Sequence, residues 1–394
     1  MKTSSPAPQQ AGSKTRSCIC TALLLFIVFF VGSVLIVPDY REKLSRWPAV
    51  ESFQNVKFGN CKNQCRPPGS EVLPTGIVSG TSNLQMRPLW GFPKADNNSS
   101  LLALPVGIKQ RDLVNEMVKK FLSSNFSVML FHYDGFVDKW KEFEWSNHVV
   151  HISAQNQTKW WFAKRFLHPD IVEDYSYIFL WDEDLGVENF DPQLYLSIVR
   201  SEGLEISQPA LDTSKSQIHQ QITARARKSV VHRRIYKPGI CDGKSSAPPC
   251  TGWVEMMAPV FTKAAWRCAW YMIQNDLIHA WGLDYQLGYC AQGDRTQNIG
   301  VVDAEYIVHY GRPTLGGTNE NEISSLTKGL AVETGNVTSV ETMVHSHPHK
   351  MDPRLKVRKQ SYIELKIFRK RWKTAIEEDK CWVDPYKRAV EQSS

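Results

Sequence analysis

The order of apolar runs between residues 101 and 135 constrains the fold of this chain most. LLALPVG (101–107) is a short apolar run, KQRDLVNEMVKKFLSS (109–124) has apolar residues at helical spacing, and FSVMLFHYDG (126–135) is a second apolar run ending in turn residues. A strand, a helix and a strand within about 35 residues form a βαβ unit, which favours a parallel sheet. We therefore predict an α/β fold with a mostly parallel sheet flanked by helices.

The same alternation continues along the chain. KWWFAKRFLHPDIVED (159–174) predicts a helix and YSYIFLWDEDL (175–185) predicts the next strand. GWVEMMAPVFTKAAWRCAWYMIQN (252–275) predicts a short apolar run followed by a helix, and IGVVDAEYIVHYG (299–311) predicts a last strand. Neither Gly-x-Gly-x-x-Gly nor Gly-x-x-x-x-Gly-Lys occurs, which excludes the dinucleotide fingerprint and the P-loop.

Three acids in a row, Asp182, Glu183 and Asp184, follow the apolar run 178–181. In open α/β sheets, ligands bind at the edge where the strands end. Asp182 and Asp184 are two residues apart, so their carboxylates can point the same way at the end of the run, and Gly186 permits the backbone to turn just beyond them. Two oxygen donors placed like this suit Mg²⁺ or Mn²⁺. A buried strand that ends in a polar turn is the alternative interpretation.

The segment CICTALLLFIVFFVGSVLIV (18–37) contains no charged residue. A helix of about 20 residues spans the roughly 30 Å hydrocarbon layer of a membrane. Lys2, Lys14 and Arg16 precede the segment without an acid, so the positive-inside rule places the N-terminus in the cytoplasm and the rest of the chain in the lumen. We predict an uncleaved signal anchor, that is, an N-terminal transmembrane helix; a cleaved signal peptide is the alternative.

Cysteines and glycosylation sequences agree with a secretory route. Seven of the nine cysteines follow the predicted anchor, and an oxidising lumen favours disulfides. Cys241 and Cys250 bracket the loop DGKSSAPP, which a disulfide between them would close. Acceptor sequences for N-glycosylation stand at Asn97, Asn98, Asn125, Asn156 and Asn336.

Charge and composition divide the chain into segments. The net charge is +7, and the sequence contains no long run of like charges, so we expect no nucleic-acid partner. The expected segments are a cytoplasmic tail (1–17), the anchor (18–37), a Pro/Gly-rich stem or wrapping segment (38–100), a catalytic body (101–320) and a basic helical extension (321–394).

The motifs KWWFAKRFLHPD, YIFLWDEDL, GWVEMMAPVF, WGLDYQLGYC and EYIVHYG resemble an uncharacterised plant family often labelled lysine ketoglutarate reductase trans-splicing related. The resemblance covers most of residues 55–390. The order of elements also resembles the GT-A type of nucleotide-sugar glycosyltransferase, which is generally a single-pass Golgi protein with a short tail, an anchor, a stem and a catalytic body.

The GT-A resemblance implies roles for six residues. Asp182 and Asp184 match the acids that hold a metal against the diphosphate of the sugar nucleotide, and His309 stands where many members supply a further metal ligand. Asp284 matches the acidic catalytic base, although members usually carry a second acid there and Tyr285 follows here. Basic residues near the nucleotide complete the set; these are Lys164 and Arg165.

These observations predict a type II Golgi membrane glycosyltransferase that moves a sugar from a nucleotide-sugar donor to a glycan or glycoprotein acceptor with Mn²⁺ or Mg²⁺. The rival is a catalytically inert relative that binds glycans or scaffolds partner enzymes.

Three features stay open. Glu255, a charge within an apolar run, is either paired or functional. The tract HSHPHK (345–350) either binds a metal or is a surface segment. The C-terminal helix, with Ile363, Ile367 and Trp372 near one face, either packs on the body or binds an acidic polymer or membrane headgroups.

Overall fold

The structure is a computed structural model that describes residues 66–80, 99–236, 241–312 and 353–386. Contacts divide the chain into residues 1–64 and 65–394, and every described residue lies in the second unit. The predicted anchor, its cytoplasmic tail, the tract HSHPHK and three of the five glycosylation sequences lie outside the described residues. Among the described residues, no helix combines the length and the apolar content that crossing a membrane requires.

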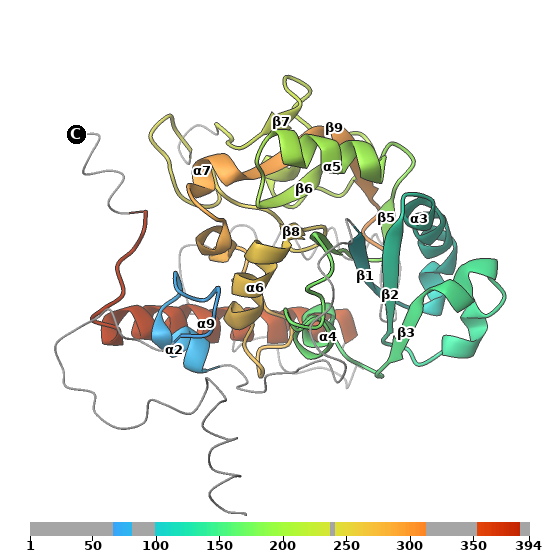
Figure 1. The fold of residues 1–394 in the computed structure, drawn as a ribbon, viewed down its shortest axis with the longest axis horizontal. Coiled ribbons are helices and arrows are strands. Elements are labelled where there is room, and N and C mark those ends of the chain that lie inside the picture. Colours follow the sequence, from blue (N-terminus) through green and yellow to red (C-terminus); the bar gives the residue numbers. More distant parts are fainter. Residues whose placement is uncertain (1–65, 81–98, 237–240, 313–352, 387–394) are drawn as a thin grey trace, which may run out of the picture. The chain divides into compact units, whose positions relative to one another are not determined.

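A single nine-stranded sheet forms the centre of the described unit (Figure 1). Its strand order is β3-β2-β1-β4-β8-β6-β9-β5, and β7 also pairs with β9. The strands are β1 (Ser100–Val106), β2 (Phe126–His132), β3 (Val150–Ser153), β4 (Tyr177–Leu180), β5 (Leu185–Gly186), β6 (Ile206–Leu211), β7 (Val231–His232), β8 (Val260–Thr262) and β9 (Ile299–His309).

Helices connect and flank these strands. They are α2 (Thr75–Ser79), α3 (Arg111–Ser123), α4 (Lys159–Phe166), α5 (Pro192–Ser201), α6 (Lys263–Met272), α7 (Arg295–Asn298) and α9 (Pro353–Glu378). Short 3₁₀ turns lie at Ile108–Gln110, Val137–Trp140, Glu144–His148, Gln221–Thr223 and Leu287–Cys290.

The predicted βαβ unit is confirmed as β1, α3 and β2. Val114, Met117, Val118 and Phe121 of α3 are buried, because helical spacing puts them on one face. The strand predicted before the acids is confirmed as β4 and the last strand as β9.

The sheet is mixed, which differs from the mostly parallel sheet that we expected. The parallel pairs are β1 with β2, β1 with β4, β2 with β3 and β6 with β9. The antiparallel pairs are β4 with β8, β6 with β8, β5 with β9 and β7 with β9. The main cause is β8, which runs against both of its neighbours in the middle of the sheet. The segment that precedes β8 therefore lies at the same edge as the end of β4.

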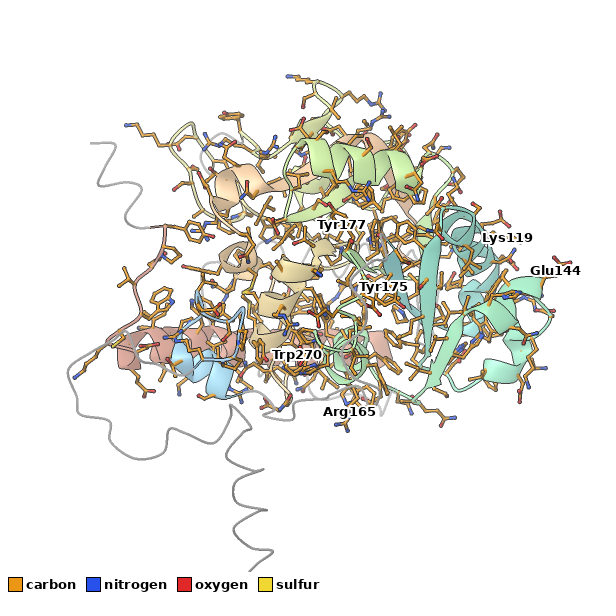
Figure 2. All side chains as sticks on the ribbon, in the orientation of Figure 1. Lys119, Glu144, Arg165, Tyr175, Tyr177 and Trp270 are labelled. Carbon is orange, nitrogen blue, oxygen red and sulfur yellow. A yellow bond between two sulfur atoms is a disulfide. The ribbon has the colours of Figure 1, made fainter. Side chains whose placement is uncertain are left out.

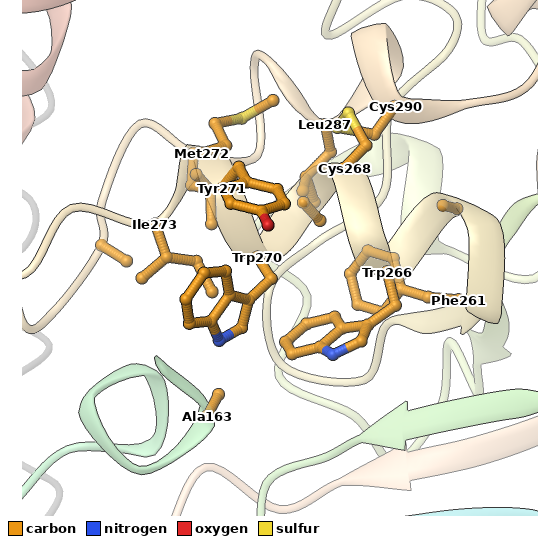
Figure 3. Close-up of a cluster of buried hydrophobic side chains, with 14 of the residues drawn as sticks. Ala163, Phe261, Trp266, Cys268, Trp270, Tyr271, Met272, Ile273, Leu287 and Cys290 are labelled. Carbon is orange, nitrogen blue, oxygen red and sulfur yellow. A yellow bond between two sulfur atoms is a disulfide. The ribbon is translucent and has the colours of Figure 1, made fainter. Parts of the chain in front are cut away.

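Two hydrophobic cores lie on the two faces of the sheet. Ile178 and Leu180 of β4 belong to the core that also takes residues from α4, α6 and α9, while Phe179 and Trp181 belong to the core that takes residues from α3 and α5. This alternation is the period-2 pattern of a strand buried on both faces. Figure 3 shows part of the first core around Trp266 of α6.

A disulfide joins Cys241 and Cys250, as the loop between them predicted. A second joins Cys268 of α6 to Cys290, which the sequence did not indicate. Replacing Cys241 and Cys250 together by Ser should lower the free energy of unfolding by about 2–3 kcal/mol, because the disulfide closes a loop of this length in the unfolded chain. Equal urea denaturation midpoints for the double variant and the native chain would contradict this.

The segment 66–80 packs on the C-terminal helix. α2 contacts α9 so closely that a Cβ on Gly76 would come within 3.0 Å of the Ala375 side chain. Arg66 forms a 2.7 Å ion pair with Asp379, and both side chains are largely buried. Part of the predicted stem or wrapping segment is therefore held against the end of α9.

Candidate functional site

The three acids lie at the edge where parallel strands end. β1, β2 and β4 run in the same direction, so Gly107 after β1, Tyr133 after β2 and Asp182 after β4 come to one edge. The backbone then crosses to β9, where β5 pairs with the end of that strand. The acids therefore connect the ends of strands from both halves of the sheet.

Glu183, the middle acid, points into the protein. Its side chain is 1% exposed; one carboxylate oxygen accepts a 2.6 Å hydrogen bond from the Gly107 amide, and the other accepts one from the Tyr133 hydroxyl. A Cβ at position 107 would collide with the Tyr133 ring, so glycine is needed there. Burial raises the pKa of Glu183 to about 8, although both hydrogen bonds oppose the rise. Glu183 thus fixes the strand ends, which leaves its two neighbours for another role.

Asp182 pairs with a lysine that the sequence did not single out. The ammonium of Lys159, at the start of α4, lies 2.6 Å from Asp182 Oδ1 and donates to the carbonyl oxygen of Met256 at 2.5 Å. The Lys159 side chain is 8% exposed, whereas that of Asp182 is 37% exposed. Loss of hydration within the surrounding protein raises the pKa of Asp182, and the charge of Lys159 opposes this rise. Asp182 therefore keeps a solvent-facing carboxylate next to a buried cation.

Asp184 and His309, the two other predicted metal ligands, lie close together. Asp184 Oδ2 accepts a 2.9 Å hydrogen bond from the Arg312 amide and lies 3.6 Å from His309 Nε2. The other ring nitrogen of His309, Nδ1, is 2.9 Å from the carbonyl oxygen of Gln217, which fixes the ring. Burial lowers the pKa of His309, but the hydrogen bond and charge of Asp184 outweigh it, and the pKa rises to about 9.

Glu255 lies among the predicted site residues. It belongs to the segment before β8, and its pKa is raised to about 7 by burial. The positive charges that act on it, from His309 and Lys159, lower this pKa, and the negative charges of Asp182 and Asp284 raise it. Glu255 Oε2 is buried and has no hydrogen-bond partner among the described residues. Within the described ranges, Glu255 Oε2 therefore has no hydrogen bond to offset its burial, and a functional role for Glu255 stays a prediction.

Asp284 faces the same region from the loop after α6. Its Oδ1 is buried and, in the described part of the chain, has no hydrogen-bond partner. Burial raises its pKa to about 6, while neighbouring backbone amides and the charge of Arg369 in α9 lower it. The charge of Asp284 also raises the pKa of Glu255.

The two predicted nucleotide contacts lie further along α4 than Lys159. The Lys164 ammonium donates to the Trp270 carbonyl at 2.8 Å and lies 3.5 Å from the centre of the Trp270 ring. Burial lowers the pKa of Lys164 to about 7. Arg165 is exposed, with its guanidinium 5.4 Å from the centre of the Trp161 ring (Figure 2). A nucleotide role for this pair stays a prediction.

Metal binding also stays a prediction. Within the ranges that the structure describes, no three His, Cys, Asp or Glu side chains already stand in an arrangement that could hold a metal ion. Lys159 pairs with one carboxylate oxygen of Asp182, Oδ1, and the Asp182 side chain is 37% exposed.

Glu183 makes a pH-dependent contribution to stability. Because its folded pKa lies above that of the unfolded chain, the folded protein keeps a proton that the unfolded chain releases, and this stabilisation is lost as pH rises from about 5 to 8. Over this pH range, the free energy of unfolding of the native chain should fall by on the order of 1 kcal/mol or more relative to that of Glu183→Gln. Urea unfolding at several pH values measures the difference, and the exposed Glu116→Gln is the control. A difference between native chain and Glu183→Gln that does not vary with pH would contradict this assignment.

Comparisons with known proteins place the chain in a family without an assigned activity. Residues 64–378 match the family described as "Protein of unknown function (DUF707)". No curated protein matches the chain. Among solved structures, 4-diphosphocytidyl-2C-methyl-D-erythritol synthase from Anaerococcus prevotii is similar, at 10% identity over 65% of this chain and 98% of that chain, with a TM-score of 0.31. The family description names no activity, so the reductase label of the plant family gains no support from it.

Proposed function

The chain belongs to the DUF707 family, whose function is unknown, and we propose that it is a metal-dependent glycosyltransferase of the GT-A type. In this proposal it transfers a sugar from a nucleotide-sugar donor to a glycan or glycoprotein acceptor. It does so as a single-pass type II protein of a Golgi or other secretory-pathway membrane, with the body in the lumen.

One observation supports this function above all: three residues that the sequence predicted separately, Asp182, Asp184 and His309, come to one edge of the sheet. Asp182 and Asp184 follow β4, and His309 ends β9. The predicted base, Asp284, lies in the loop after α6. The charges of Asp182, Asp284 and His309 all shift the pKa of Glu255. A site assembled from several strand ends is where α/β proteins place ligands.

The donor set fits a divalent cation. Asp182, Asp184 and His309 would hold it, and the two carboxylates suit Mn²⁺ or Mg²⁺. Buried carboxylate oxygens without a partner are costly unless positive charge compensates them, and Glu255 Oε2 and Asp284 Oδ1 are two such oxygens. When bound, the cation would supply charge stabilisation to the departing nucleoside diphosphate.

The residues that move the proton are carboxylates. Breaking the bond between sugar and diphosphate requires an acceptor hydroxyl that loses its proton as it attacks the sugar. A general base works best when its pKa lies near the operating pH, and the values of about 6 for Asp284 and about 7 for Glu255 are close to neutrality. Asp284 is the proposed base, and Glu255 is a second carboxylate that holds or shares the proton.

Lys159 compensates the charge of Asp182 in the ligand-free protein. Its ammonium is held by backbone carbonyls of Met256 and Met257 as well as by the carboxylate. The carbonyls would keep it at this edge when Asp182 turns to a metal, so a fixed positive charge would remain near the diphosphate.

The inert scaffold is favoured by one observation, which is that Asp182 already has a short ion pair to Lys159 and needs no metal for compensation. A scaffold that keeps the fold without turnover would show no response to nucleotide and metal.

Thermal unfolding of the full-length chain in detergent tests the proposal. UDP or GDP together with Mn²⁺ should raise the melting temperature, because a ligand of the folded state stabilises it by about 2.7 kcal/mol at 100 times its Kd. Neither the nucleotide alone nor Mn²⁺ alone should give the full shift. No shift with any nucleoside diphosphate would leave the scaffold as the better account.

A further inference from the structure

The exposed face of α9 combines lysines with apolar side chains. The buried side of the helix includes Phe368, Trp372 and Ala375, which pack into the first core. Ile363 and Ile367 lie on the other side, so the expectation that they share a face with Trp372 is wrong: Trp372 is 6% exposed, whereas the isoleucines are 43% and 38% exposed. We call this exposed side the lysine face; its members are Leu355, Lys356, Lys359, Tyr362, Ile363, Lys366, Ile367, Lys370 and Lys373.

The charge of the lysine face has one sign over most of its length. Glu364 is the only acid between Leu355 and Ile376, and it is buried and bound to His279 at 2.8 Å. The exposed acids Glu377 and Glu378 come only in the last turn. Among the described residues, Lys359, Lys366 and Lys370 take part in no ion pair, and at about 1.5 Å per residue they cover roughly 16 Å of the helix.

We propose that the lysine face of α9 is a membrane-docking surface that binds anionic phospholipid headgroups. Lysines attract anionic lipids. The apolar and aromatic side chains of the same face would lie at the level of the headgroups; these are Leu355, Tyr362, Ile363 and Ile367. An acidic polysaccharide would pair with the lysines but would leave Leu355, Ile363 and Ile367 in water, so the apolar residues favour a lipid surface.

The connectivity of the chain is compatible with docking of α9 on a bilayer. The described chain starts at Arg66, whose ion pair with Asp379 holds it at the C-terminal end of α9. The charge-free segment 18–37 precedes it by only 28 residues, 38 to 65. If that segment is the predicted anchor, a tether of this length keeps the body at high local concentration near the bilayer, where weak headgroup contacts are sufficient.

Lysine acetylation of the full-length chain, mapped by mass spectrometry, tests the docking surface without nucleotide or metal. The chain is mixed with vesicles of phosphatidylcholine alone or with about 30% phosphatidylserine, a lipid whose charge gives basic surfaces their membrane affinity. Acetylation of Lys359, Lys366 and Lys370 should slow at least about fivefold in the anionic vesicles. Lys119 and Lys141, which are exposed away from α9, should react at the same rate in both.

Two further arms make the result specific. The variant Ile363→Asp/Ile367→Asp should lose the protection, because charged side chains cannot enter the headgroup layer, and its unchanged melting temperature would show that the fold is intact. Equal acetylation rates in both vesicles would overturn the proposal. Protection by polygalacturonate in neutral vesicles, equal to that by phosphatidylserine, would overturn it in favour of an acidic polymer. None of these outcomes depends on the nucleotide site.

Discussion

Asp184→Asn should weaken the Mn²⁺-dependent binding of UDP or GDP by about 100-fold or more, since a metal loses a charged ligand and the diphosphate then faces the remaining acids. The fold should survive, because the asparagine oxygen can still accept the hydrogen bond from the Arg312 amide. Isothermal titration of nucleotide with Mn²⁺ into the native chain and the variant measures the loss. Asp182→Asn should behave in the same way.

A matched control separates this effect from a general loss of charge. Asp276→Asn removes an exposed acid that pairs with Arg371 at 2.6 Å on α9. Exposed ion pairs contribute about 0–1 kcal/mol, so stability and nucleotide binding should change little. Native affinity in both Asp182→Asn and Asp184→Asn would mean that these acids only end a strand.

Trp266→Ala should lower the free energy of unfolding by about 3–5 kcal/mol, the usual cost of removing a large buried aromatic side chain. Trp266 is fully buried, stacks obliquely on Phe261 at 5.3 Å, and donates from Nε1 to the Leu167 carbonyl at 2.8 Å. The variant therefore leaves both a cavity and an unpaired Leu167 carbonyl. Urea denaturation of the full-length chain measures the difference.

Phe136→Ala is the control for the core prediction. Phe136 is 54% exposed, so its removal opens no cavity and should change the unfolding free energy by less than about 0.5 kcal/mol. Similar losses for Phe136→Ala and Trp266→Ala would show that the first core does not have the packing described.

The strands that lie next to the site could be predicted from sequence because both faces of each are buried. β1 and β4 read as continuous apolar runs, and the helix α3 between β1 and β2 has a clear apolar face. β6 was missed although all six of its residues are buried, because Ser207, Gln208 and Pro209 interrupt its apolar pattern. Its pairing with β9 shifts in register at Pro209, as expected where proline cannot donate to the ladder.

The acids of the candidate site could be found from their place after β4, but their partners could not. Lys159 contacts Asp182 from the start of α4. Its local sequence, Lys-Trp-Trp, does not show that Lys159 and not Lys164 faces the acids. Glu255 was noticeable as a charge in an apolar run, but its neighbours are known only once β8 is seen to run antiparallel to β4. Contacts between such distant segments are set by strand direction, which local patterns do not encode.

Electron–nuclear double resonance on Mn²⁺ bound to the full-length chain tests the central claim most directly, because it identifies the atoms attached to the metal. With UDP or GDP present, the native chain should show coupling of Mn²⁺ to the phosphorus of the diphosphate and to a histidine nitrogen. His309→Gln should lose the nitrogen coupling and keep the phosphorus coupling. A Mn²⁺–nucleotide spectrum that is the same with and without the protein would contradict the claim that Asp182, Asp184 and His309 hold a metal against a nucleoside diphosphate.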